Sequence, residues 1–106
     1  MNKTYNKLVR DNIIDIIEKS GKTCTFKVLD ENEYLDSLSN KLFEELNEFQ
    51  ENFDIEELAD LQEVILAILK AKNISEKEFD EIRLKKQKKN GAFDKKLFLI
   101  DVEEKD

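Results

Sequence analysis

Histidine and proline are absent from this 106-residue chain, and glycine and cysteine are scarce. Without histidine the usual general base near neutral pH is missing, so any hydrolysis would have to use carboxylates, lysine or metal-activated water. The absence of proline and the presence of only two glycines favour long, uninterrupted helices. The single cysteine, Cys24, excludes an intrachain disulfide and is typical of a protein from the reducing cytosol.

Long apolar runs are missing as well. The longest, Val64 to Leu69, is far too short to span a membrane, and no signal peptide is visible. A formal charge of −7 argues against a protein that binds duplex nucleic acid, because such proteins usually carry a basic surface. No GxxxxGK[ST] motif is present, which disfavours a P-loop hydrolase. We therefore expect a cytoplasmic protein that acts neither on duplex nucleic acid nor at a membrane.

Length and periodicity predict one mainly helical domain over residues 1–106. Four segments with apolar stripes and capping residues should form helices, over about 9–20, 31–51, 55–72 and 76–89. The stretch 23–29 alternates, with Cys24, Phe26 and Val28 on its buried face, and 97–102 could pair with it. The expected fold is thus a bundle of about four helices with a small two-stranded β element.

The helix predicted over 31–51 carries carboxylates beside its core-facing stripe of leucines. A helix turns about 100° per residue, so Glu45 lies roughly 60° from Leu42 and Glu48 roughly 120° from it, on the same side. Glu44 lies roughly 160° away and is expected to face solvent. In the next helix Glu57 projects into the apolar sector and Asp60 lies on its flank.

Four carboxylates would therefore meet between the two helices, namely Glu45, Glu48, Glu57 and Asp60. Converging carboxylates repel one another unless positive charge lies among them, and oxygen-only ligand sets suit Mg²⁺ or Mn²⁺. The spacing alone leaves other interpretations open. Asp54-x-x-Glu57 also fits a capping box, and a chain with 25 acidic residues places some of them three apart by chance.

The same residues resemble motifs of a known family. Glu44-Glu45-x-x-Glu48 followed by Glu57-x-x-Asp60 is similar to the EExxE and ExxD motifs of the MazG-like, all-α nucleotide pyrophosphohydrolases. The segments YNKLVRDNI and RLKKQKKNGAF resemble the phosphoribosyl-ATP pyrophosphohydrolase-like branch, and the likeness runs from about Tyr5 to Leu99. One departure is the link of only eight residues between Glu48 and Glu57, which leaves little room for a loop over the substrate.

The resemblance implies Mg²⁺-dependent cleavage of the α–β phosphoanhydride of a nucleoside triphosphate or of phosphoribosyl-ATP. The four carboxylates would hold the metal, and Glu45 or Glu48 would take the proton of the attacking water. Cations would neutralise the phosphates, and the candidates are Lys7, Arg10, Arg83 and Lys86. Lys7 and Arg10 stand where the helix predicted over 9–20 begins, a position that does not suit cations. For each of these bases the alternative is an ordinary solvated side chain.

Aromatic and apolar residues suggest two further features. Phe49 or Phe93 could contact the base of the nucleotide. The segment Val64 to Leu69 is apolar almost all round, so its helix is expected to be central in the fold or to lie at a subunit interface, as in a homodimer or homotetramer. Two other functions fit the same sequence. One is a nucleotide sensor that binds without turnover, and the other is a helical module whose acidic faces meet a basic partner protein.

Overall fold

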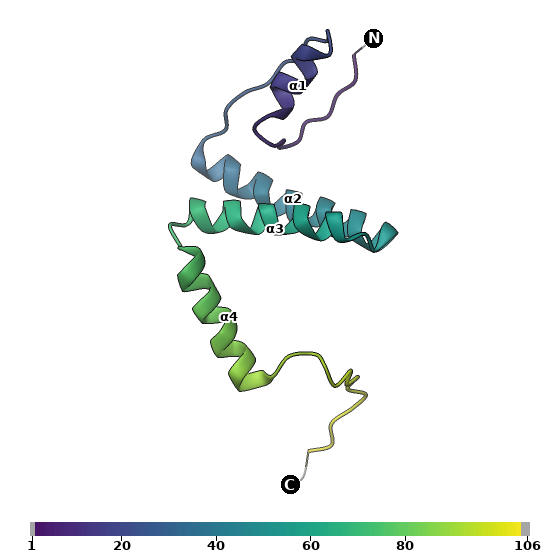
Figure 1. The fold of residues 1–106 in the computed structure, drawn as a ribbon, viewed down its shortest axis with the longest axis vertical. Helices are drawn as coiled ribbons and strands as arrows, with labels where there is room; N and C mark the ends of the chain where they lie inside the picture. Colours follow the sequence, from purple (N-terminus) through teal and green to yellow (C-terminus); the bar gives the residue numbers. More distant parts are fainter. Residues whose placement is uncertain (1, 105–106) are drawn as a thin grey trace. The chain divides into compact units, whose positions relative to one another are not determined.

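The computed structural model describes residues 2–104 and contains four helices there (Figure 1). They are α1 (Ile13–Lys19), α2 (Glu31–Asn52), α3 (Ile55–Ala71) and α4 (Glu76–Asn90). The predicted helical class and number of helices are therefore confirmed. The chain divides into two units, one up to Ile74 and one from Ser75 onward.

Side-chain caps set where the helices begin. The Asp30 carboxylate accepts a hydrogen bond from the Glu33 amide at 2.8 Å, and the Glu33 carboxylate accepts one from the Asp30 amide at 3.4 Å. This capping box starts α2 where the sequence predicted it. At α4 the Ser75 hydroxyl accepts from the Glu78 amide at 3.1 Å, and Gly91, with φ of 83°, ends the helix.

Helix α1 is shorter than predicted, since it begins at Ile13 rather than at Val9. Its end is as expected, because Gly21 has a positive φ of 88° and its amide donates to the Glu18 carbonyl at 3.0 Å. Lys7 and Arg10 therefore belong to the irregular segment before the helix and not to its first turn.

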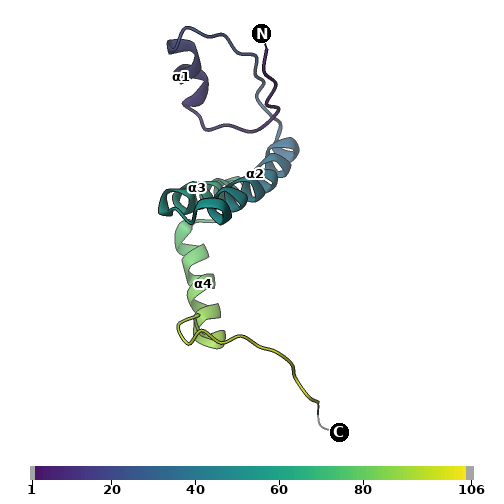
Figure 2. The same cartoon turned by 90° about the vertical axis from the view of Figure 1, so that its right-hand side faces the viewer.

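Helices α2 and α3 lie side by side and form the hairpin that carries the carboxylates (Figures 1 and 2). Phe53, in the left-handed conformation with φ of 52°, ends α2, and the Asp54 carboxylate caps α3 by accepting from the Glu56 amide at 3.5 Å. The buried side chains of the described residues all belong to this hairpin, and they are Leu38, Glu45, Val64 and Leu69. Within residues 2–104 no helix combines the length and apolar character needed to cross a bilayer.

The predicted two-stranded β element is not formed within residues 2–104. Segments 23–29 and 97–102 have no regular secondary structure, and none of the backbone hydrogen bonds described there involves either of them. The face expected to be buried is exposed, with Phe26 at 60% and Val28 at 92%. Alternation shows that a stretch can present one apolar face, whereas a ladder also needs a neighbouring strand, and these segments belong to different units.

Candidate functional site

Three carboxylates from the α2–α3 hairpin come together. Glu45 of α2 and Glu57 and Asp60 of α3 each offer one oxygen, and these three atoms lie within 4.8 Å of one another. The spacing of three residues places Glu57 and Asp60 on one side of α3 near its start. The short turn at Phe53 then brings this side against α2, so the hairpin itself assembles the group.

Two oxygens of this group are buried and have no hydrogen-bond partner among residues 2–104. Glu45 is only 7% exposed, and both its Oε2 atom and the Oε2 atom of Glu57 are removed from water with nothing to pair with. Buried polar atoms in folded proteins are nearly always satisfied, because an unpaired one is costly. The carboxylates therefore offer unfilled coordination capacity that a hard cation would satisfy.

The ionisation of both glutamates is opposed by their surroundings. Burial raises the pKa of Glu45, the nearby charge of Glu48 raises it further, and Lys41 partly offsets this. The pKa of Glu57 is raised first by loss of water contact, then by the adjacent carboxylate of Glu48 and by the other negative charges around it. A divalent cation would favour the ionised forms of both groups, so binding would release protons.

Glu48 occupies a different place from its three predicted partners. It is half-buried on α2 and interacts with Glu57, but it does not belong to the group of oxygens within 4.8 Å. Asp54 caps α3 through the Glu56 amide, while Glu57 keeps an unpaired oxygen, so the capping box considered for Glu57 does not account for its side chain.

Two of the predicted cations lie beside the acidic residues of the hairpin. The Arg10 guanidinium contacts Oδ1 of Asp60 through Nη1 at 3.2 Å. The Lys7 ammonium contacts Oε1 of Glu44 at 2.8 Å, which raises the pKa of Lys7. The N-terminal segment thus brings two positive charges to the edge of the carboxylate group.

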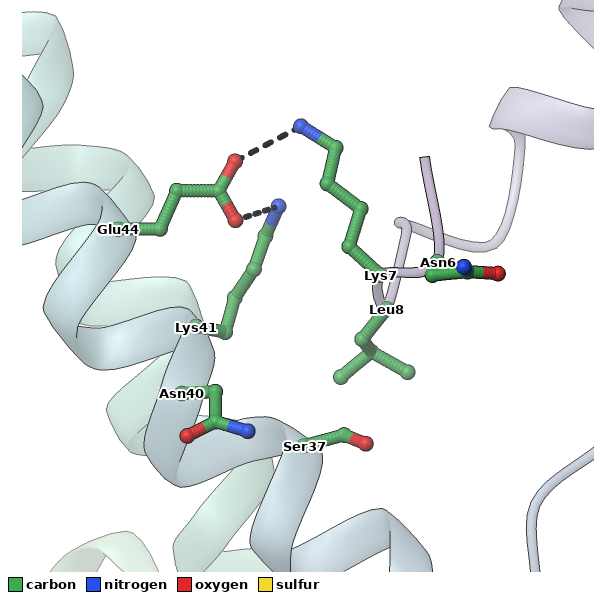
Figure 3. Close-up of a pocket in the computed structure, with 7 residues that line it drawn as sticks. All are labelled: Asn6, Lys7, Leu8, Ser37, Asn40, Lys41 and Glu44. Atoms are coloured by element: carbon green, nitrogen blue, oxygen red, sulfur yellow. Dashed lines mark hydrogen bonds and ion pairs between the residues drawn. The ribbon is translucent and has the colours of Figure 1, made fainter. Parts of the chain in front are cut away.

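The prediction that Glu44 faces solvent is wrong, and its real surroundings include a residue that sequence reasoning missed. Lys41 donates to Oε2 of Glu44 at 3.1 Å and lies 3.7 Å from Oε1 of Glu45. Figure 3 shows Lys7 and Lys41 meeting the two oxygens of Glu44 at a hollow that Ser37 also lines. The pKa of Glu44 is lowered, chiefly by its hydrogen bond with Lys7.

A signal for Lys41 was present in the sequence. It precedes Glu44 by three residues and Glu45 by four, which are the spacings at which oppositely charged side chains meet on a helix. Its side chain is only 14% exposed, so it is a cation held within the site rather than a solvated base.

The other predicted substrate contacts have less support. Arg83 and Lys86 belong to the second unit, where Arg83 pairs with Asp80 of its own helix at 3.0 Å. Phe49 stacks edge to face with Phe53, with ring centres 5.3 Å apart, and Phe93 is 95% exposed. The roles predicted for these residues stay predictions.

Comparison of the chain with protein-family models, with curated proteins and with solved structures gives no match. The resemblance to MazG-like enzymes therefore depends on the motifs of the sequence. The geometry of the hairpin is an independent observation, because it follows from the positions of the atoms and not from the motifs.

Proposed function

We propose that the protein is a Mg²⁺-dependent nucleotide pyrophosphohydrolase with a MazG-like helical bundle, active as a homo-oligomer. The observation that carries the proposal is the group formed by Glu45, Glu57 and Asp60, in which two buried oxygens lack any partner. A cluster of exposed acids would need no cation, whereas these buried oxygens do.

The donor set fits a hard divalent ion. All its ligands are carboxylate oxygens, with neither histidine nor thiol among them, which suits Mg²⁺ or Mn²⁺ better than zinc or copper. Glu45, Glu57 and Asp60 would hold the ion, with Glu48 beside them. When bound, the ion would withdraw charge from the phosphate oxygens and acidify a water molecule.

The residues of the chain would then supply the proton acceptor and the phosphate contacts. Water attacks the α-phosphorus, the bond to the bridging oxygen breaks, and pyrophosphate leaves. A carboxylate, Glu45 or Glu48, takes the proton of the water. Arg10 and Lys7 would contact the phosphates, and the support for this role is that both side chains lie against anionic groups of the hairpin.

Release of pyrophosphate from a panel of ordinary, deoxy and modified nucleoside triphosphates and from phosphoribosyl-ATP, with and without Mg²⁺, tests the proposal. The variant Glu57→Gln should lose the activity, because it removes one ligand without changing the size of the side chain. Glu63→Gln is the matched control, since Glu63 is an exposed glutamate of the same helix. Activity that survives in Glu57→Gln would contradict the assignment.

Two other outcomes would each favour one of the other functions. Saturable, Mg²⁺-dependent nucleotide binding without release of pyrophosphate would indicate a sensor. A protein that binds neither metal nor nucleotide would point to an acidic helical module for protein binding.

A further inference from the structure

Two exposed apolar stretches have no strand neighbour in the described part of the chain. In the first, 23–29, Phe26 and Val28 are 60% and 92% exposed. In the second, 97–102, every large apolar side chain is at least 72% exposed, and Phe98 reaches 90%. Neither stretch takes part in the backbone hydrogen bonds of residues 2–104, so their backbone donors and acceptors are available to form a ladder.

The two stretches are complementary when they run in opposite directions. In one antiparallel register, apolar residues face apolar residues and opposite charges meet at both ends. The facing pairs are Lys22–Glu104, Cys24–Val102, Phe26–Ile100, Val28–Phe98 and Asp30–Lys96. All five pairs lie on the same face, because side chains alternate along a strand. Such facing pairs are the unit that stabilises a sheet.

Other arrangements lose this match. In the parallel arrangement with the same ends aligned, Lys22 would face Lys96 and Asp30 would face Glu104, so like charges would meet at both ends. If the antiparallel register is shifted by two residues so that Val28 faces position 96 instead of 98, Val28 lies opposite Lys96. The antiparallel register is therefore specified by both the apolar and the charged residues.

We propose that residues 97–102 of one copy of this chain pair, as an antiparallel strand, with residues 23–29 of a second copy. Each copy carries both stretches, so a two-fold pair of chains would satisfy all four and close on itself. Charge favours this approach, because the residues up to Ile74 carry the net negative charge of the chain, whereas Arg83 to Lys96 is strongly basic.

Cross-linking between two single-cysteine chains tests the pairing. One chain is the parent, whose only cysteine is Cys24, and the other is the double variant Cys24→Ser/Val102→Cys with a tag that changes its size. Facing residues of an antiparallel pair lie within the range of Cα separations that a disulfide spans. The two proteins are mixed and treated with oxidised glutathione. A disulfide-linked dimer of one parent chain and one tagged variant chain should then appear on a non-reducing gel. The matched control, Cys24→Ser/Asp101→Cys, points its thiol to the opposite face and should lose that band.

Charge exchange gives a second readout that does not depend on disulfide chemistry. Lys22→Glu should weaken association measured by sedimentation, and adding Glu104→Lys to the same chain should restore it. Mixed disulfide from Val102→Cys but not from Asp101→Cys, together with this rescue, would support the pairing.

Three results would overturn it. In a chain that keeps Cys24 and carries Val102→Cys, exclusive closure of an internal disulfide would show pairing within one chain. Equal cross-linking from Val102→Cys and Asp101→Cys would show that the two stretches come into contact but do not pair as strands in a fixed register. A monomer that forms neither the mixed nor the internal disulfide would show that the stretches do not meet. None of the substituted residues belongs to the carboxylate group, so these results are independent of the proposed enzymatic function.

Discussion

Replacing Glu45 by glutamine should stabilise the metal-free protein. Its carboxylate oxygen lies within 4.8 Å of one from Asp60. At that separation two unit charges repel by about 0.9 kcal/mol in a water-like medium and by about 3.5 kcal/mol at an effective dielectric constant of about 20. Glu45 is buried and Asp60 half-exposed, so a repulsion of about 2 kcal/mol is appropriate.

The substitution also removes the attraction between Glu45 and Lys41 at 3.7 Å, which outweighs the repulsion from Asp60. The cost of burying the charge of Glu45 and the repulsion from Glu48 are larger still, so a net stabilisation of about 1 kcal/mol is expected. In saturating Mg²⁺ the parent should instead be more stable than Glu45→Gln. A ligand present at a hundred times its dissociation constant adds about 2.7 kcal/mol to the parent, and the variant should gain far less.

Urea unfolding followed by far-ultraviolet circular dichroism, in EDTA and in saturating Mg²⁺, measures both effects. Glu63→Gln is the control, and as an exposed site it should shift the free energy of unfolding by no more than about 0.5 kcal/mol in either condition. The reasoning is refuted if Glu45→Gln is less stable than the parent in EDTA, or if Mg²⁺ stabilises both proteins equally.

Three further outcomes follow from the same contacts. The raised pKa values of Glu45 and Glu57 mean that the folded protein binds more protons than the unfolded one above the ordinary value of 4.5. Metal-free stability should therefore fall as pH rises from about 4.5 toward neutrality, and Mg²⁺ should flatten this fall in urea titrations across pH. Lys41→Met should lower the free energy of unfolding by about 1–2 kcal/mol, because it leaves Glu44 and Glu45 without their shared cation, and a rise in stability would contradict this role. Asp30→Ala should cost about 1 kcal/mol by removing the cap of α2, whereas Asp30→Asn should cost much less in the same assay.

Local rules of helix formation predicted much of the hairpin. The capping pair Asp30 and Glu33 located the start of α2, and the tight turn expected at Asn52–Asp54 separates α2 from α3. Rotation by about 100° per residue placed Glu45 near the core, and its side chain is buried. These features depend on residues close together in the sequence, so their geometry follows from the helix itself.

Contacts between distant parts of the chain could not be predicted in this way. A helical wheel gives the direction of Glu44 but not the arrival of Lys7 from the N-terminal segment. The leucine stripe was expected to be buried along its length, yet Leu46 is 41% exposed. The half-buried strand predicted around Phe26 is not formed within residues 2–104, because a strand needs a partner that only tertiary or quaternary contacts supply.

The two-residue turn between α2 and α3 has a consequence for the order of folding. Contacts between residues close in sequence form first, so the hairpin should close before the N-terminal segment docks. The carboxylates of Glu45, Glu57 and Asp60 would then meet before Arg10 arrives to relieve their repulsion. If the carboxylates bind Mg²⁺ as proposed, divalent cations present during synthesis would speed this step as well as stabilise its product, so the availability of Mg²⁺ would influence how quickly the chain becomes native.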